Sequence, residues 1–424
     1  MKKRLYFVAA RYFRFWAKIQ LKRWRPKVFV ITGSSGKTTM LHLAEAQLGS
    51  KARYSHKANS SFGVPFDILG LSRKELKRTE WLSLISKAPF KAFKGIHKQS
   101  IYVVEVDCDR PGEGKFLAEL LRPNGVIWLS STQTHAMNFD KLVKSGKFNN
   151  VEQAIAFEYG HILRATSELS ILNRDNPDIT KQSEPGLGPK ENILVSSKNI
   201  VSYRPGLEST IFTHEGNFKQ LPKEFTIPSL VPEEAGLSAL ATLILCFNLN
   251  FKFDKDFKNF LPPPGRSSVF KGIKNTTLID GTYNASLDAA EAILNMFASL
   301  DVPKKWVVIS DVLEQGESEQ KVHQQLARDI AKYKFDKIIV MGPRCKKFCS
   351  PVLTQLKVEH TAVKTPREVL DILESELTGG ETILFKGTRF LEGVIEHLLK
   401  DKADAAKLCR REAVWVKRRR AWGL

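Results

Sequence analysis

The chain has 424 residues, 42% of them hydrophobic and 26% charged, so it is long enough for two or three domains and apolar enough to bury their cores. A single small module and a disordered chain are both excluded. The net charge of +21 is concentrated at the ends, because residues 1–28 contribute +10 and residues 407–424 contribute +6. The nearly balanced remainder argues against a protein that wraps nucleic acid along its surface, and we expect no nucleic-acid partner.

Residues 1–27 are predicted to form a basic amphipathic helical arm. Apolar residues recur at helical spacing, and most of the cations gather on one stripe of the helix. Such a helix either lies on an anionic membrane surface, with its rings at the level of the headgroups, or packs its rings against the following domain. The apolar positions are Leu5, Val8, Tyr12, Phe15 and Ile19, the basic stripe comprises Arg4, Arg11, Arg14, Lys18, Lys22 and Arg25, and Phe7, Phe13, Trp16 and Trp24 fill other sides.

The C-terminal residues 407–424 repeat this chemistry as a basic tail with two tryptophans. Arg11, Arg14 and Lys18 interrupt the first apolar stretch, so we expect no signal peptide, and no run of 18 apolar residues predicts a membrane span. The five cysteines are few, odd in number and scattered, which indicates a reducing compartment. We therefore expect a cytoplasmic protein, peripheral at the inner face of the cell membrane if the two basic ends bind lipid.

Between the basic ends, short apolar runs alternate with helical periodicity. This pattern predicts an α/β fold, in which a central domain with a mostly parallel sheet, residues 28–262, precedes a smaller Rossmann-like α/β domain, residues 263–406. A Pro-rich segment marks the boundary. The predicted strands are residues 28–33, 101–107, 125–131 and 169–173 in the first domain, and residues 276–281, 305–311, 337–342 and 381–387 in the second.

The segment from Ile31 to Thr39 follows an apolar run and opens a predicted helix, which is the context of a phosphate-binding loop. Glycines let backbone N–H groups close around an anion, and the helix N-terminus adds a positive dipole. Lys37 would reach the terminal phosphates, and the Thr38 hydroxyl would bind Mg2+. Ile31 stands where the longer form of the motif has its first glycine. The loop predicts that residues 28–262 form a central P-loop domain that binds a nucleotide, and the residues expected to hold it are Gly33, Ser34, Ser35, Gly36, Lys37, Thr38 and Thr39.

Further motifs follow in the order in which the ATP-dependent Mur ligases carry them, and the chain resembles that family over about residues 28–398. Within the family, residues 283–285 (Tyr-Asn-Ala) and residues 310–316 resemble the MurF branch, which joins a dipeptide to a nucleotide-linked muramoyl peptide. The matching segments are residues 33–38, 59–65, 105, 122–135, 172–175, 265–266, 279–285, 310–323 and 386–389. The resemblance implies a peptide ligase of cell-wall (peptidoglycan) synthesis.

The resemblance implies that the chain forms an amide bond after ATP converts a carboxylate into an acyl phosphate. Lys37, Glu105 and His135 would then be the catalytic residues, with Lys37 offsetting the charge on the phosphates. Thr38, Glu105 and His135 would hold Mg2+, which prefers hard oxygen ligands. Arg266 would contact the phosphate side of the nucleotide from the second domain.

The same resemblance assigns the remaining contacts. Asn284 would lie on the adenine side of ATP, so that the second domain closes over the nucleotide and excludes water. Cations at residues 386 and 389 suit the carboxylate of the incoming amino component. The expected substrate contacts are Asn59, Ser60, Lys386 and Arg389.

Departures from the family's pattern leave the substrate open. Only residues 1–27 precede the loop strand, where the family has a UDP-binding domain. Tyr159 stands at the position of the family's carbamylated lysine, and the neighbouring Glu158 could supply the missing carboxylate. We therefore expect either a small or a lipid-linked muramoyl-peptide-like acceptor, joined to an amino acid or a dipeptide. Two alternatives are a precursor-modifying subunit of the amidating type and a nucleotide-binding, membrane-associated scaffold with weak or no catalysis.

Overall fold

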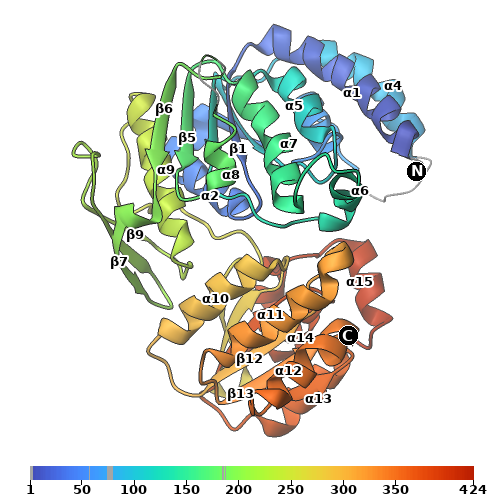
Figure 1. Ribbon diagram of the computed structural model, residues 1–424, viewed down its shortest axis with the longest axis vertical. Helices are drawn as coiled ribbons and strands as arrows, with labels where there is room; N and C mark the ends of the chain where they lie inside the picture. Colours follow the sequence, from blue (N-terminus) through green and yellow to red (C-terminus); the bar gives the residue numbers. More distant parts are fainter. Residues whose placement is uncertain (1–2, 57, 74–79, 184–185, 187) are drawn as a thin grey trace. The chain divides into compact units, whose positions relative to one another are not determined.

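A computed structural model describes the chain except for residues 1–2, 57, 74–79, 184–185 and 187, and it divides into two compact units (Figure 1). The N-terminal unit comprises residues 1–199, 216–221 and 237–254, and the C-terminal unit comprises residues 200–215, 222–236 and 255–424. This division differs from the boundary predicted at residue 262. The strands of residues 200–227 belong to the C-terminal unit, although they precede the Pro-rich segment in sequence.

The N-terminal unit is built on a six-stranded parallel sheet with the order β2-β3-β1-β4-β5-β6. Alternate residues of its strands, such as Val28 and Val30, pack into one core with the helices α1, α3, α4, α5 and α7, while α2 contacts β1 and β3. The strands are β1 Lys27–Thr32, β2 Ala52–Tyr54, β3 Ile101–Val106, β4 Gly125–Trp128, β5 Leu169–Asn173 and β6 Glu191–Val195. The helices are α1 Lys3–Trp24, α2 Lys37–Leu48, α3 Gly63–Leu69, α4 Glu80–Phe93, α5 Glu113–Leu121, α6 Asp140–Lys144, α7 Val151–Ala165 and α8 Pro177–Thr180, with α9 Glu234–Asn248 mostly in this unit.

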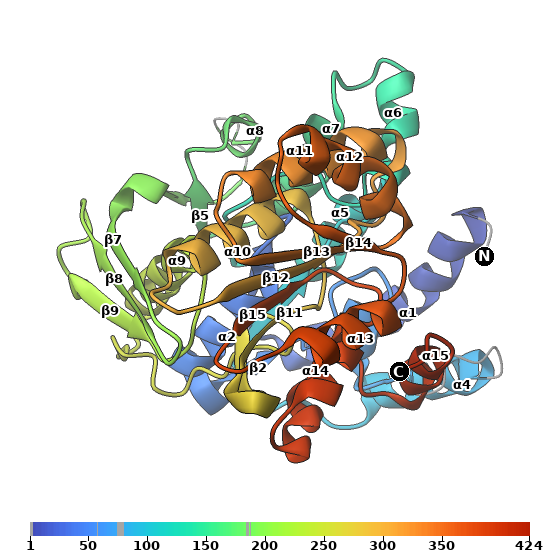
Figure 2. The ribbon, with the colours of Figure 1, turned by 90° about the horizontal axis from the view of Figure 1, so that it is seen from below.

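The C-terminal unit contains a second six-stranded sheet, β10-β11-β15-β12-β13-β14, in which only β10 runs antiparallel to its neighbour. Figure 2 shows α10, α11 and α12 over one face and α13 and α14 over the other, and each face has its own core. The strands are β10 Ser268–Lys271, β11 Thr277–Gly281, β12 Lys305–Ser310, β13 Lys337–Met341, β14 Thr361–Val363 and β15 Thr382–Lys386. The helices are α10 Leu287–Ser299, α11 Glu319–Ala331, α12 Ser350–Gln355, α13 Pro366–Glu376, α14 Leu391–Leu398 and α15 Ala413–Arg420.

A small antiparallel sheet of β7 Ile200–Pro205, β8 Thr210–His214 and β9 Glu224–Ile227 completes the C-terminal unit. Phe212 and Phe225 stack across it with their ring centroids 5.4 Å apart, so the sheet has an apolar face of its own. Both large sheets are of the strand–helix type that the alternating sequence pattern predicts. The α/β fold class is confirmed.

Helix α1 is part of the core of the N-terminal unit, so the prediction of a separate arm is corrected. Ala10, Phe13 and Ala17 are fully buried, and the indole Nε1 of Trp24 donates to the carbonyl of Gln99 at 2.6 Å. The two alanines let the helix approach its neighbours closely, which is why the buried face differs from the predicted apolar positions. Residues 1–2 of the predicted arm and the side chains of residues 3–5 lie outside the described part of the structure.

The C-terminal basic segment is also folded rather than a free tail. Arg419 of α15 is only 4% exposed, and its guanidinium lies 3.8 Å from Glu392 and 3.5 Å from Glu396 of α14. Arg411 pairs with Glu396 at 2.8 Å as well. The acids of α14 therefore bind part of the positive charge that the sequence concentrates at this end. Among the helices that the structure describes, none is long and apolar enough to cross a membrane.

The burial of α1 can be tested by comparing two phenylalanines on that helix. We expect Phe13→Ala to lower the free energy of unfolding by about 3–5 kcal/mol, because its ring is fully buried and lies 4.7 Å from that of Phe66. Phe15→Ala is the matched control and should change stability by about 0.5 kcal/mol or less, since Phe15 is 59% exposed. Urea unfolding of the full chain measures both, and equal losses would contradict the packing of α1.

Candidate active site

The phosphate loop connects the carboxyl end of β1 with the first turn of α2, in the parallel sheet of the N-terminal unit. Gly33 has a φ of 129°, and a Cβ there would lie 2.7 Å from the carbonyl oxygen of Ser130. The N–H of Ser34 donates to that carbonyl at 3.1 Å, and the N–H of Ser35 donates to the Ser130 hydroxyl at 2.9 Å. Gly36 caps α2 in the left-handed region with no side-chain acceptor, which leaves the positive helix terminus facing the loop.

Lys37 is held inside this loop by a buried ion pair. Its Nζ donates to the carbonyl of Gly33 at 2.6 Å and lies 3.0 Å from Oδ2 of Asp107, which follows β3. Burial by itself would lower the pKa of Lys37, but the carboxylates of Asp107 and Glu105 outweigh it and raise that pKa above its ordinary value. Lys37 is therefore positively charged and points at the loop before a phosphate arrives.

Thr38 and Glu105 meet at the carboxyl ends of two adjacent strands, as the motif order predicts. The Thr38 hydroxyl donates to Oε2 of Glu105 at 3.0 Å, and the Asn59 amide donates to Oε1 at 3.3 Å. The side chain of Glu105 is buried, and its position is fixed by a bond from its own N–H to the Ser55 hydroxyl at 2.8 Å. These oxygens are of the hard type that Mg2+ prefers.

His135 lies with two aspartates that the sequence analysis did not single out. Single ligand atoms of Asp107, Asp109 and His135 lie within 4.8 Å of one another, and His135 Nε2 is 3.3 Å from Asp109 Oδ1. The structure thus places His135 with Asp107 and Asp109, and its predicted share in holding Mg2+ with Thr38 and Glu105 stays a prediction. The two aspartates follow Glu105 at alternate positions past the end of β3, and this spacing is the signal that could have found them.

The two aspartates titrate differently because only Asp107 pairs directly with Lys37. Burial raises the pKa of both carboxyls, but Lys37, followed by His135, reverses the effect at Asp107 and holds its pKa below the usual range. The pKa of Asp109 rises to about 7 through burial and the charge of Asp107. The stable charge of Asp107 makes it the anionic centre of the group.

Tyr159, at the position of the family's carbamylated lysine, reaches the loop with its hydroxyl. The oxygen lies 3.0 Å from both the Gly33 carbonyl and Oδ1 of Asp107. The hypothesis that Glu158 supplies the missing carboxylate is wrong in the geometry observed here. Its two oxygens accept the N–H groups of Gly112 and Gly114, at 2.8 and 3.1 Å, at the start of α5.

The remaining predicted residues of this unit position the loop and its neighbour helix. The Ser34 hydroxyl exchanges two hydrogen bonds of 2.8 Å with the backbone of Thr132. The Ser60 hydroxyl accepts the N–H of Gly63 at 3.1 Å, where α3 begins. Ser60 thus has a structural task in addition to its predicted contact with substrate, and Thr39 lies in the first turn of α2.

Three predicted residues of the C-terminal unit come together at the carboxyl ends of β11 and β15. The Nζ of Lys386 donates to the Asn284 carbonyl at 2.9 Å, and the guanidinium of Arg266 lies over the ring of Tyr283 at 4.5 Å. Burial, with a smaller contribution from the charge of Arg266, lowers the pKa of Lys386 to about 7, although Asp280 opposes the shift. Lys386 is therefore poised between its neutral and charged forms near neutral pH.

Arg389 is fixed by a fully buried carboxylate. Its Nε lies 2.9 Å from Oδ2 of Asp311, and the guanidinium of Arg344 lies 3.6 Å from the same oxygen. The sequence analysis did not identify Asp311 or Arg344 as partners of Arg389. Asp311 also lies close to His323 and Cys345, but the His323 Nε2 accepts the N–H of Val312 at 3.1 Å, so this buried group has a structural role.

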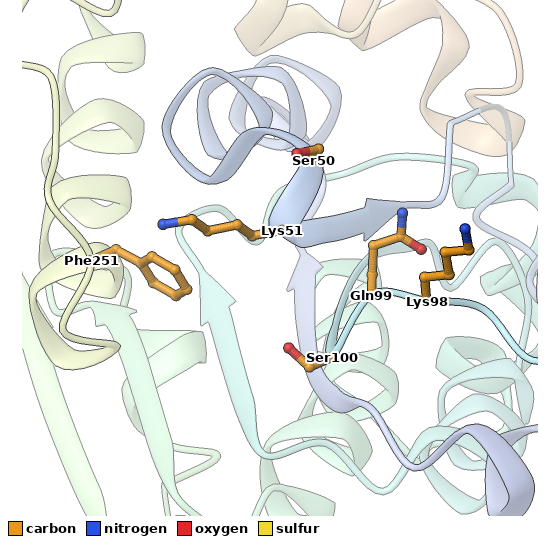
Figure 3. A pocket seen from close by; sticks show the side chains of 6 residues that line it. All are labelled: Ser50, Lys51, Lys98, Gln99, Ser100 and Phe251. Atoms are coloured by element: carbon orange, nitrogen blue, oxygen red, sulfur yellow. The ribbon is translucent and has the colours of Figure 1, made fainter.

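A pocket of about 290 Å3 in the N-terminal unit lies away from the phosphate loop (Figure 3). Its residues 50–51 and 98–100 directly precede β2 and β3, whereas the loop follows the carboxyl end of β1. Since these strands are parallel, the pocket lies at the amino ends of the strands, whereas the phosphate loop lies at their carboxyl ends. Figure 3 shows Lys51 extending toward Phe251, with its Nζ 4.6 Å from the ring centroid. The pocket is not part of the candidate active site.

Comparison with known proteins supports the resemblance seen in the motifs. Residues 265–389 match the family model described as Mur ligase, glutamate ligase domain. UDP-N-acetylmuramoyl-tripeptide–D-alanyl-D-alanine ligase of Borreliella burgdorferi is 26% identical over 336 residues, which are 74% of this chain and 62% of that relative. The Bacillus subtilis enzyme of the same name is 22% identical over 92% of this chain and 78% of its own length. The chain thus spans less than two thirds of the Borreliella relative.

Solved structures share the fold of both units. The MurF ligase of Thermotoga maritima in complex with ADP gives a TM-score of 0.72 at 20% identity and covers 91% of this chain and 82% of its own. A structure of MurF from Acinetobacter baumannii gives a TM-score of 0.71 at 19% identity and covers 91% of this chain and 79% of its own. At these identities the likeness establishes the fold.

The structural task of Glu158 predicts how its removal affects the protein. Glu158→Ala leaves the N–H groups of Gly112 and Gly114 without their acceptor, and that of Gly114 is buried, so we expect a loss of about 1–3 kcal/mol in the free energy of unfolding. The affinity of the folded protein for a fluorescent ATP analogue should remain unchanged. The exposed Glu191 provides the control, since Glu191→Ala should alter neither quantity. Loss of nucleotide binding with unchanged stability would instead restore the carboxylate-donor hypothesis.

The lowered pKa of Lys386 predicts a pH dependence of stability. Between about pH 7 and its ordinary pKa of 10.5, the unfolded chain binds a proton at this residue that the folded chain does not. Stability should therefore rise with pH across this window, and Lys386→Met should reduce the rise. Thermal unfolding of the full chain from pH 7 to pH 10 measures the effect. The control, Lys271→Met at an exposed site, should keep the wild-type slope; identical slopes in all three proteins would show that Lys386 titrates normally.

Proposed function

From its similarity to the Mur ligases of the MurF branch, we propose that this chain is an ATP-dependent amide-forming ligase of peptidoglycan precursor synthesis. The observation that carries the proposal is the phosphate loop, in which a buried, charged Lys37 lies between the Gly33 carbonyl and Asp107. Beside it, Thr38 and Glu105 share a hydrogen bond of 3.0 Å at the end of the adjacent strand. A charged lysine, a helix terminus and a hydroxyl–carboxylate pair at one sheet edge suit a nucleotide triphosphate with its metal ion.

ATP and Mg2+ fit the residues around the loop. Gly33 has no room for a Cβ beside Ser130, so only glycine lets the loop make this close turn ahead of the helix terminus. Thr38 and Glu105 are the residues that would hold Mg2+, and the group of Asp107, Asp109 and His135 could hold a second ion. Bound Mg2+ would neutralise part of the phosphate charge.

The chain's own groups would perform separate tasks in amide formation. The proposed reaction transfers the γ-phosphoryl group of ATP to the acceptor carboxylate, and the amine of the second substrate then displaces the phosphate. Lys37 would stabilise the negative charge that develops during the first transfer. Tyr159 would keep Asp107 and the Gly33 carbonyl in place beside it.

In the C-terminal unit, Arg389 would bind the carboxylate of the amino component. Its Nε is held by Asp311, which orients the guanidinium. Arg266 and Asn284 remain predicted nucleotide contacts, and the pKa of Lys386 near 7 would let it accept or release a proton at physiological pH.

The names of the relatives guide the choice of substrate. The Borreliella and Bacillus relatives act, by name, on a UDP-N-acetylmuramoyl-tripeptide and D-alanyl-D-alanine. We propose a muramoyl-peptide-like acceptor, soluble or lipid-linked, together with an amino acid or a dipeptide. Asn59 and Ser60, which precede α3 near Glu105, are the proposed acceptor contacts. A cytoplasmic enzyme that is peripheral to the membrane through its basic segments would meet either form of the acceptor.

Phosphate release tests the catalytic role of Lys37. We expect Lys37→Ala to lower amine-stimulated phosphate release about a hundredfold or more, because the charge on the transferring phosphoryl group loses its nearest cation. Lys51→Ala is the matched control, since Lys51 lies in the pocket at the amino ends of the strands, away from the loop. Thr38→Ala supplies a second variant that leaves the Lys37–Asp107 pair intact, and it should raise the Mg2+ concentration needed for half-maximal phosphate release.

The substrates in this assay are a muramoyl tripeptide, free or lipid-linked, and D-alanyl-D-alanine or single amino acids. If the wild-type chain binds ATP but no acceptor and amine pair stimulates phosphate release, the ligase proposal fails and the scaffold alternative stands. If Lys37→Ala retains wild-type turnover, the loop is not the catalytic site.

A further inference from the structure

Helices α1 and α4 lie side by side on the outside of the N-terminal unit, at the blue end of the colour scale in Figure 1. The Tyr12 hydroxyl of α1 donates to the carbonyl of Ile85 at 2.8 Å, and Arg23 donates to the carbonyl of Ala92 at 2.7 Å. The two helices therefore form one continuous layer. We call its outer side the α1–α4 surface; it comprises Val8, Arg11, Phe15, Lys18, Lys22, Leu82, Ile85, Lys87, Phe90, Phe93, Lys94, Ile96 and Lys98.

The α1–α4 surface concentrates exposed apolar side chains. Of the fifteen large hydrophobic residues that are prominently exposed in the described part of the chain, seven lie on it. Leu82 and Phe90 are each 75% exposed, and Phe93 is 59% exposed. Pro89, Phe90, Phe93 and Lys94 line a shallow hollow. Scattered exposed apolar residues are ordinary, but a cluster of this kind indicates an interaction surface.

Helix α4 is apolar on two sides, and only one of them packs on the protein. Leu84, Ala88 and Ala92 are buried against α1 and α3, at helical spacing. Leu82, Phe90 and Phe93 are exposed and lie on the opposite side of the helix. The second stripe is not needed for the core of this unit, so another partner must account for it.

The charges on the same surface have one sign. Residues 3–24 and residues 81–100 contain no aspartate or glutamate. Within the described residues, no carboxylate pairs with Lys18, Lys22, Lys87 or Lys94. On α1, two exposed apolar residues and three exposed cations share one stripe that runs through positions 8, 11, 15, 18 and 22.

We propose that the α1–α4 surface binds an anionic lipid bilayer, with the rings and leucine of α4 at the level of the headgroups and the surrounding lysines on lipid phosphates. This inference rests on the peripheral attachment proposed above and assigns it to a specific surface. Lysine stems lie along apolar surface while their ammonium groups reach phosphate, so this mixture of residues suits an interface better than a protein core. A second copy of the chain is a poorer partner, because a two-fold contact would bring cations against cations.

The proposal separates the two basic ends of the chain. The cations of α15 are partly bound by Glu392 and Glu396, whereas the lysines of the α1–α4 surface have no such partners among the described residues. The apolar stripe of α4 was not part of the sequence prediction, which assigned lipid binding to residues 1–27 and 407–424. Helix α4, rather than α15, should therefore dominate attachment.

Co-sedimentation of the full chain with vesicles tests the proposal. We expect binding to vesicles that contain about 30% phosphatidylglycerol in phosphatidylcholine to be at least about tenfold stronger than binding to pure phosphatidylcholine, and to weaken with salt. The double variant Phe90→Ser/Phe93→Ser should bind about tenfold more weakly, because it removes two exposed rings without opening a cavity. Lys87→Glu/Lys94→Glu should weaken binding to a similar extent.

Matched controls lie in the C-terminal unit. Leu356→Ser removes an exposed apolar side chain, and Lys346→Glu/Lys347→Glu reverses two exposed charges. Both of these control variants should bind vesicles like the wild-type chain. The proposal is overturned if the α4 variants bind like these controls, if neutral and anionic vesicles bind equally, or if no vesicles bind. A different outcome would identify a second copy of the chain as the partner. In that case the wild-type chain binds no vesicles but forms a dimer in sedimentation velocity, and Phe90→Ser/Phe93→Ser abolishes the dimer.

Phosphate release without vesicles distinguishes this proposal from the ligase proposal. The α4 variants should keep wild-type turnover with a soluble acceptor, since their substitutions lie outside the candidate active site. Vesicle binding by a chain that releases no phosphate would support the α1–α4 surface and reject the ligase. Normal turnover by a chain that does not bind vesicles would support the ligase proposal and reject lipid binding by the α1–α4 surface.

Discussion

The buried ion pair between Lys37 and Asp107 is the interaction on which the candidate site depends. A charge in a protein interior costs several kcal/mol unless it is paired and hydrogen-bonded, and here each partner meets that condition through the other. The pair connects the first turn of α2 with the end of β3, and Tyr159 adds α7 to the same cluster by contacting Asp107 and Gly33. The loop is therefore in place before a ligand binds.

That constraint explains how the chain departs from the pattern of the family it resembles. A tyrosine cannot form a carbamate, and Glu158 is committed to the N-terminus of α5. The carboxylate that pairs with Lys37 comes instead from Asp107, directly after the strand that carries Glu105. The three carboxylates among the proposed metal-binding groups, Glu105, Asp107 and Asp109, thus lie at alternate positions at the end of β3.

The basic ends show the limit of periodicity as evidence. Apolar and aromatic residues occupy almost every side of residues 3–24, so spacing alone could not decide which side is buried. Close contact with α3 and α4 selects the side with Ala10 and Ala17, because small residues let helix backbones approach. The predicted stripe of Val8 and Phe15 is left outside, and the exposed side of α4 extends it.

By itself, the sequence determined the strand–helix order of both large sheets, the phosphate loop and the association of Thr38 with Glu105, because these features depend on residues at or near strand ends whose order follows the chain. Only the tertiary structure decided that His135 lies with Asp107 and Asp109, that Asp311 holds Arg389, and that both basic ends are folded. These contacts join segments far apart in sequence, and burial, charge pairing and close helix packing select them only once the sheets have formed.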